Sequence, residues 1–246
     1  WIVPMSSNLG PGFPGTPRLL DTRAINVSHV GFAWSGNGRW IAFNGELVDM
    51  AGAAHNATAS IFLISAEGGE PRQVYETNRD ARVVNYRMSL SPDGGTLAIS
   101  ALREGQVEGP DETEKRIIYT VAVRGGDPRP LTEMWGRMPA FSPDGERIAY
   151  VSARQSPSDS VWGSDLWVIP AEGGTPVKVA TSEPGRFRGP VWSPDGRYLA
   201  AHYEPGRNNF SQELWILPLD STGPSEPIAR IRLPSTSWNM PAGWTR

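Results

Sequence analysis

Arginines recur where apolar segments of the chain begin, and their side chains are suited to binding a charged ligand. Arg137 and Arg188 are 51 residues apart, in the sequences Arg-Met-Pro and Arg-Gly-Pro, and Arg87 is one residue out of register with them. A guanidinium group can hold a carboxylate through two parallel hydrogen bonds. We therefore predict that these three arginines bind an anionic group. The alternative is that each one pairs with an acidic neighbour, such as Asp80, Glu133 or Glu183.

Three aspartates recur with the same regularity, and repeated carboxylates can indicate catalysis or metal binding. Asp93, Asp144 and Asp195 each follow Ser-Pro and precede Gly. Proline presets the first turn dihedral, aspartate tolerates the second position, and glycine accepts the left-handed conformation that follows. We interpret the three aspartates as turn residues.

Other catalytic patterns are missing from the sequence. No Gly-x-Ser-x-Gly nucleophile motif occurs, and the chain has no cysteine for disulfides or thiolate metal sites. The three histidines, His29, His55 and His202, are not at metal-binding spacing. His202 lies in a segment of strand character, where we expect it to be packed or on a surface. We predict no catalytic residue, no metal site and no cofactor.

The elements that position the arginines come from a repeated sequence. A strand-turn-strand pattern occurs four times, with its serines at Ser35, Ser91, Ser142 and Ser193. A second pattern lies between these copies, in which an apolar segment runs into Gly-Gly, as at 61–71, 119–128 and 166–176. Each repeat of about fifty residues therefore contains two hairpins, or four strands, which is typical of a propeller blade.

The period divides the whole chain into one all-β propeller domain, 1–246. We predict a half-blade at 1–22, the start of a closing blade at 238–246, and four blades at about 24–77, 78–132, 133–181 and 182–233. Either the C-terminal strand pairs beside residues 1–5 in a five-bladed ring, or the chain is part of a larger propeller. The second possibility is favoured, because the sequence starts inside a blade and ends before a turn.

Blade topology also predicts where the arginines lie. Innermost strands line the central channel, so equivalent arginines at their beginnings converge at its mouth. The connections between the second and third strands, 46–59, 103–116, 154–164 and 204–212, are long and lie on this same face, whereas the opposite face has only tight hairpins. Variable loops on a rigid scaffold commonly bind ligands. We expect a peptide terminus or an acidic protein segment to bind there.

The alternation of Ser-Pro-Asp-Gly with Leu-Trp-Val-Ile-Pro-Ala-Glu-Gly-Gly resembles the TolB-like propeller repeats. Such repeats occur in periplasmic TolB, in tricorn-type proteases and in the propellers of prolyl-oligopeptidase-like peptidases. The resemblance covers nearly the whole chain and implies the fold, but the same repeat serves several functions.

Composition limits the function classes further. The net charge is −3, which argues against a general nucleic-acid binder, and no apolar run is long enough to span a membrane. Two functions remain. The chain is a non-catalytic module that binds a protein or peptide, or it gates substrates for a serine peptidase or other hydrolase whose catalytic domain lies outside it. The resemblance implies a periplasmic or extracellular location.

Overall fold

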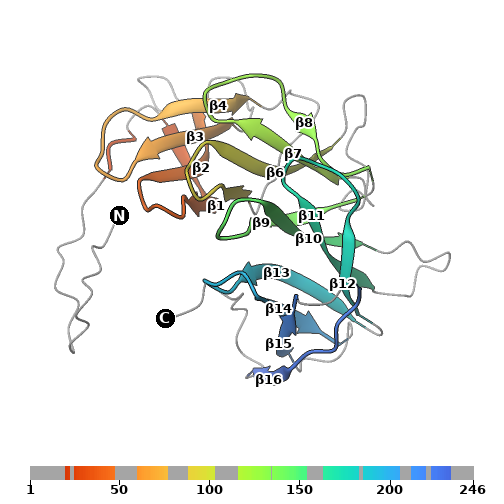
Figure 1. The fold of residues 1–246 in the computed structure, drawn as a ribbon. Helices are drawn as coiled ribbons and strands as arrows, with labels where there is room; N and C mark the ends of the chain where they lie inside the picture. The colour runs from red at the N-terminus through yellow and green to blue at the C-terminus, as the bar shows by residue number, and fades with distance from the viewer. Residues whose placement is uncertain are drawn as a thin grey trace, which may run out of the picture.

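The protein is built from four small antiparallel sheets arranged side by side (Figure 1). The computed structural model describes residues 20–22, 25–47, 60–76, 88–102, 116–133, 135–153, 163–182, 185–205, 212–219 and 223–233, except the side chains of residues 28–30 and 153. Within these ranges there are sixteen strands and no helix. The predicted all-β architecture of four-stranded propeller blades is confirmed.

Consecutive strands form each blade. Blades 1 and 2 comprise β1 (Ile25–Trp34), β2 (Trp40–Leu47), β3 (Ser60–Ser65), β4 (Arg72–Glu76), β5 (Met88–Leu90), β6 (Thr96–Leu102), β7 (Arg116–Ala122) and β8 (Arg129–Pro130). Blades 3 and 4 comprise β9 (Arg137–Phe141), β10 (Arg147–Ala153), β11 (Ser164–Pro170), β12 (Val177–Thr181), β13 (Arg186–Trp192), β14 (Tyr198–Glu204), β15 (Gln212–Pro218) and β16 (Ala229–Leu233). The expected half-blade at 1–22, apart from residues 20–22, and the closing strand at 238–246 lie outside the described residues.

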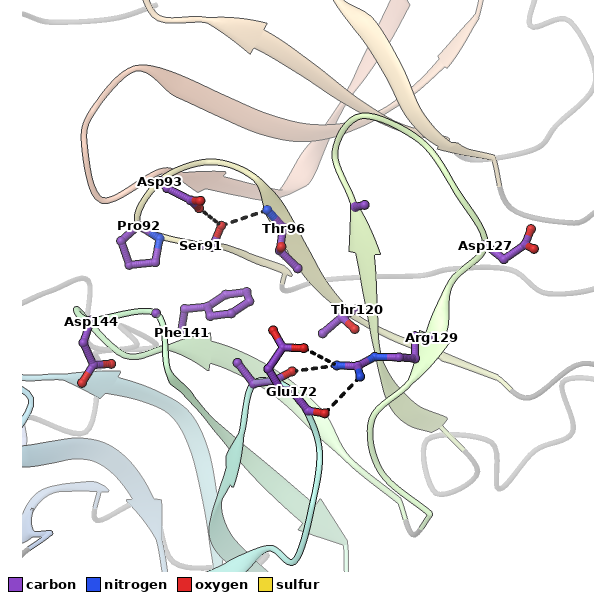
Figure 2. A pocket seen from close by; sticks show the side chains of 13 residues that line it. Ser91, Pro92, Asp93, Thr96, Thr120, Asp127, Arg129, Phe141, Asp144 and Glu172 are labelled. Carbon is purple, nitrogen blue, oxygen red and sulfur yellow. Dashed lines mark hydrogen bonds and ion pairs between the residues drawn. The ribbon is translucent and has the colours of Figure 1, made fainter.

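The turn between the first two strands of a blade is held by its serine and aspartate side chains. Figure 2 shows the copy in blade 2, where the Ser91 hydroxyl donates to Asp93 Oδ1 at 2.5 Å and accepts from the Thr96 N–H at 2.9 Å. The Asp93 carboxylate also accepts from the Gly95 N–H at 2.9 Å. Gly94 has a φ of 78°, in the left-handed region that glycine adopts without strain. The aspartates are therefore turn residues, as the sequence predicts.

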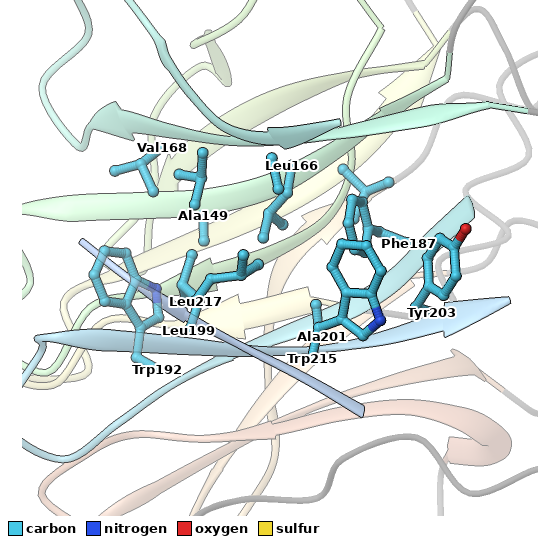
Figure 3. Packing of buried hydrophobic residues seen from close by; sticks show 13 residues of the cluster. Ala149, Leu166, Val168, Phe187, Trp192, Leu199, Ala201, Tyr203, Trp215 and Leu217 are labelled. Carbon is cyan, nitrogen blue, oxygen red and sulfur yellow. The ribbon is translucent and has the colours of Figure 1, made fainter. Parts of the chain in front are cut away.

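Neighbouring blades pack face to face through apolar side chains. Between blades 2 and 3, Ile118 packs with Ile148 and Tyr150. Between blades 3 and 4, Leu166 packs with Leu199 and Phe187, in the cluster that Figure 3 shows. Alternate residues of each central strand thus face the preceding and the following blade, which is why these strands are apolar on both sides.

Each innermost strand contacts the next one, β1 with β5, β5 with β9, and β9 with β13. Hydrogen bonds join them: the Phe141 N–H donates to the Ser89 hydroxyl at 2.9 Å, and Trp192 Nε1 donates to the Ala140 carbonyl at 2.9 Å. These bonds set the relative height of successive blades, so that residues one repeat apart lie at equivalent levels.

Candidate functional site

Two of the predicted arginines, Arg137 and Arg188, lie at the end of their blades opposite to the tight hairpins. Arg137 begins β9 and Arg188 lies near the beginning of β13, and both are half-buried. Arg87 lies outside the described residues. The residues that directly follow the two described arginines are in contact, because the Gly189 N–H donates to Met138 Sδ at 3.1 Å. Two of the three predicted residues are therefore on adjacent inner strands at the same level.

A backbone bulge follows both arginines. The pairing of β9 with β10 shifts between Ala149 and Val151, and the pairing of β13 with β14 shifts after Arg188. Met138 and Gly189 have φ values of 55° and 52° at this point. A bulge changes the direction in which the adjoining side chains point. In both blades, the Arg-x-Pro sequence therefore coincides with a bulge and also supplies a positive charge.

Arg188 has an acidic partner that the sequence analysis did not identify. Its Nε atom lies 2.9 Å from Glu204 Oε1, and the other oxygen of the same carboxylate pairs with Arg186 Nε. The Glu204 side chain is only 11% exposed. Two guanidinium groups therefore share one largely buried carboxylate, which offsets only part of their positive charge.

His202 completes this cluster from the neighbouring position on β14. Its side chain is buried, and Nε2 lies 3.0 Å from Gln212 Oε1, so that Nε2 carries the proton of the neutral ring. Nδ1 lies 3.9 Å from Glu204 Oε1 and makes no hydrogen bond. Burial lowers the pKa of His202, although Gln212 and Glu204 oppose this effect. The histidine is a packed residue within a polar cluster.

The cluster belongs to blade 4 and is not a general feature of the repeat. One period earlier, the positions of His202 and Glu204 are occupied by Val151 and Ala153. Val151 packs against the core residues of blade 4. Arg186 and Glu204 are directly opposite each other on paired strands, but the bulge after Arg188 prevents this register from being counted back from the hairpin turn. The acidic residues close to the arginines along the chain, such as Glu133, therefore do not include this partner.

No group of three or more His, Asp or Glu side chains among the described residues could hold a metal ion. No helix in the described part of the chain has the length and hydrophobicity needed to cross a membrane.

Comparison with solved structures decides the type of propeller. A structure assigned to TolB from Agrobacterium tumefaciens matches with a TM-score of 0.57 and 26% identity, over 81% of this chain and 61% of that one. The chain has a TolB-like propeller fold. A structure of prolyl endopeptidases matches this TolB-like propeller with a TM-score of 0.58, over 85% of this chain and 29% of that one. Its identity of 12% shows the shared fold alone.

Relatives found by sequence extend this comparison. The TolB-like propeller is 26% identical to the uncharacterized protein Atu1656 of Agrobacterium fabrum, over 77% of this chain and 54% of the relative. It is 33% identical to the uncharacterized peptidase YuxL of Bacillus subtilis over 79 residues, which are 32% of this chain and 12% of the relative. No family model matches. The chain thus spans about half the length of Atu1656 and a small part of YuxL.

Proposed function

We propose that the chain is a non-catalytic binding module that engages a protein or peptide through its long-loop face. The observation that carries this proposal is the arginine cluster, by which we mean Arg137 and Arg188 at the same end of the adjacent inner strands β9 and β13, with Arg186 and Arg188 sharing the carboxylate of Glu204. The favoured ligand is an anionic group, either the carboxylate of a peptide terminus or an acidic segment of a protein. We also propose a periplasmic or extracellular location, which rests on the resemblance to TolB.

The electrostatics of the cluster favour an added anion. Like charges that are crowded in a partly buried site repel one another unless an anion compensates them. A ligand carboxylate that reaches Arg137 and Arg188 would add a second negative charge beside the two guanidinium groups that share Glu204. Charge-assisted hydrogen bonds of this kind are stronger than neutral ones and weaken as salt is added.

The test is the binding of a fluorescein-labelled tetraglutamate peptide, followed by fluorescence anisotropy at low and at physiological ionic strength. Tetraglutamate should bind, and tetralysine with the same label should not. Replacing both Arg137 and Arg188 with alanine should weaken tetraglutamate binding about tenfold or more, because each charged hydrogen bond contributes about 1.5–3 kcal/mol.

The control is a double variant that removes the same charge from the hairpin face. Arg72→Ala with Arg124→Ala changes two exposed arginines near the Gly-Gly turns and should leave binding unchanged. If both double variants reduce binding equally, the effect comes from net charge and not from the arginine cluster. If tetraglutamate does not bind the parent chain at all, the proposed site is wrong.

The second candidate function is substrate gating for a hydrolase domain outside this chain. The similarity to the peptidase YuxL and to the propeller of prolyl endopeptidases favours it. The test is whether the full gene product from its native source reacts with a fluorophosphonate probe, which labels serine hydrolases. Labelling would support gating, and its absence together with tetraglutamate binding would support the binding module.

A further inference from the structure

A pocket of about 510 Å³ lies between blades 2 and 3 on the hairpin face, away from the arginine cluster (Figure 2). Thr96 and Asp93 of blade 2 and Phe141 and Gly145 of blade 3 line it. It lies beside the point where the two turns meet, since a Cβ added to Gly145 of blade 3 would lie 3.3 Å from Pro92 Cδ of blade 2. The interface between blades 3 and 4 shows which side chain is missing from this pocket.

Between blades 3 and 4, the equivalent space is filled by an arginine side chain. The guanidinium of Arg147 lies over the ring of Trp192, 4.8 Å from its centroid. Its Nη2 atom donates to the Gly196 carbonyl at 3.3 Å and lies 3.7 Å from Asp144 Oδ2. The ring, the carbonyl and the carboxylate together form a binding site for a guanidinium within the protein itself.

The pocket between blades 2 and 3 keeps the acceptors of that site and lacks the arginine. One period of 51 residues earlier, Phe141 takes the place of Trp192 and Gly145 that of Gly196. Asp93 takes the place of Asp144, and a short side chain, Thr96, takes the place of Arg147. All four of these residues line the pocket.

The interface between blades 1 and 2 supports the same interpretation. The residue equivalent to Thr96 is there Trp40, whose ring packs on Gly94 so closely that a Cβ added to Gly94 would lie 2.6 Å from Trp40 Cδ1. Of the three blade interfaces that the structure describes, two are therefore filled at this position by a large side chain of the chain itself. The third has a threonine and a cavity.

The charge of the pocket matches a cation. Four acidic residues are among those that line it, Asp93, Asp127, Asp144 and Glu172, and the carboxylate of Asp144 also lies 3.7 Å from Arg147 Nη2 of the next interface. The only basic residue in the lining, Arg129, is already engaged by blade 3: it donates to the carbonyls of Ala171 and Glu172 and lies 3.5 Å from the Glu172 carboxylate. Hydrogen bonds from Ser91 and Ser142 lower the pKa of Asp93 and of Asp144, so both are ionised at neutral pH.

We propose that this pocket binds a guanidinium group, supplied by an arginine side chain of a peptide or by a small arginine derivative. The bound group lies against Phe141 and near the Gly145 carbonyl and the Asp93 carboxylate, as Arg147 does in the next interface. The site is independent of the proposed anion-binding function, since it lies on the opposite face and selects the opposite charge.

The test is an NMR titration of the isotope-labelled chain with N-acetyl-arginine amide and with its neutral isostere, N-acetyl-citrulline amide. The arginine compound should cause saturable shifts at the amides of Gly95 and Gly145. The citrulline compound should bind at least about tenfold more weakly, because it lacks the charge that strengthens the hydrogen bonds. A Gly-Gly-Arg-Gly-Gly peptide in a parallel titration separates the two sources, as tighter binding of the peptide indicates an arginine within a protein segment.

Two substitutions fill the pocket in the ways that the chain itself uses. Thr96→Arg reproduces blade 3 and Thr96→Trp reproduces blade 1, and both should abolish the shifts, while Thr96→Ser should leave them unchanged. The dispersion of the remaining amide signals shows that each variant is folded. The proposal is wrong if no saturable shifts occur, if citrulline binds as tightly as arginine, or if both filled variants still bind.

Discussion

The interfaces between blades 2 and 3 and between blades 3 and 4 have the same design and differ at one end. Ile118 and Leu166 occupy equivalent positions in the two apolar cores, and both side chains are 0% exposed. At the hairpin end, Arg147 stacks on Trp192 in the second interface, whereas Thr96 faces Phe141 across a pocket in the first. The closed interface and the one with a pocket therefore differ at two positions of the repeat, where Arg147 and Trp192 correspond to Thr96 and Phe141.

The largest expected effect tests whether the two cores are equivalent. Ile118→Ala and Leu166→Ala each remove a fully buried side chain, and each should lower the free energy of unfolding by about 2–5 kcal/mol. Urea denaturation followed by circular dichroism measures both. If only Leu166→Ala is destabilising, the interface between blades 2 and 3 is loosely packed throughout and the pocket is not a local feature.

An intermediate effect comes from exchanging the residues at the hairpin end. Arg147→Thr should lower the free energy of unfolding by about 1 kcal/mol, because the cation–π contact with Trp192 is lost at a partly exposed site. Arg147→Lys should retain part of this stability. If the urea midpoint of Arg147→Thr equals that of the parent chain, the contact between Arg147 and Trp192 does not stabilise the interface.

The smallest effect concerns the turns beside the two interfaces. A hydrogen bond from the serine lowers the pKa of Asp93 and of Asp144, and Arg147 contributes further only to Asp144. A carboxylate with a lowered pKa in the folded state stabilises the fold above its unfolded pKa of about 3.9. That stabilisation is lost as the pH falls through the lower folded value.

Serine substitutions separate the two turns. Ser91→Ala should flatten the acid dependence of stability more than Ser142→Ala, because Arg147 still keeps the pKa of Asp144 low in the second variant. The urea midpoint measured at a series of acid pH values gives this dependence. Equal flattening in both variants would show that Arg147 does not affect the turn of blade 3.

Most of the fold could be predicted from the sequence because its signals are local. Asp144 bonds to Ser142 two residues away, and the Gly145 backbone occupies the left-handed region that the turn requires. The nearly continuous apolar run of a strand such as β10 predicts that both of its faces are buried. The site was predicted less completely: Arg137 and Arg188 are placed at adjacent inner strands, but the ion pair of Arg188 with Glu204 was not foreseen.

The sequence by itself determined the period, which is visible in its repeats, and the turns, whose hydrogen bonds join residues a few positions apart. Tertiary structure alone decided the partner of Arg188, because a bulge at Gly189 shifts the register between β13 and β14. It also decided that Thr96 borders a cavity, because the size of that space depends on the side chain that a different blade brings to it. Pairing across strands and packing across blades join residues far apart in sequence, and no local pattern records them.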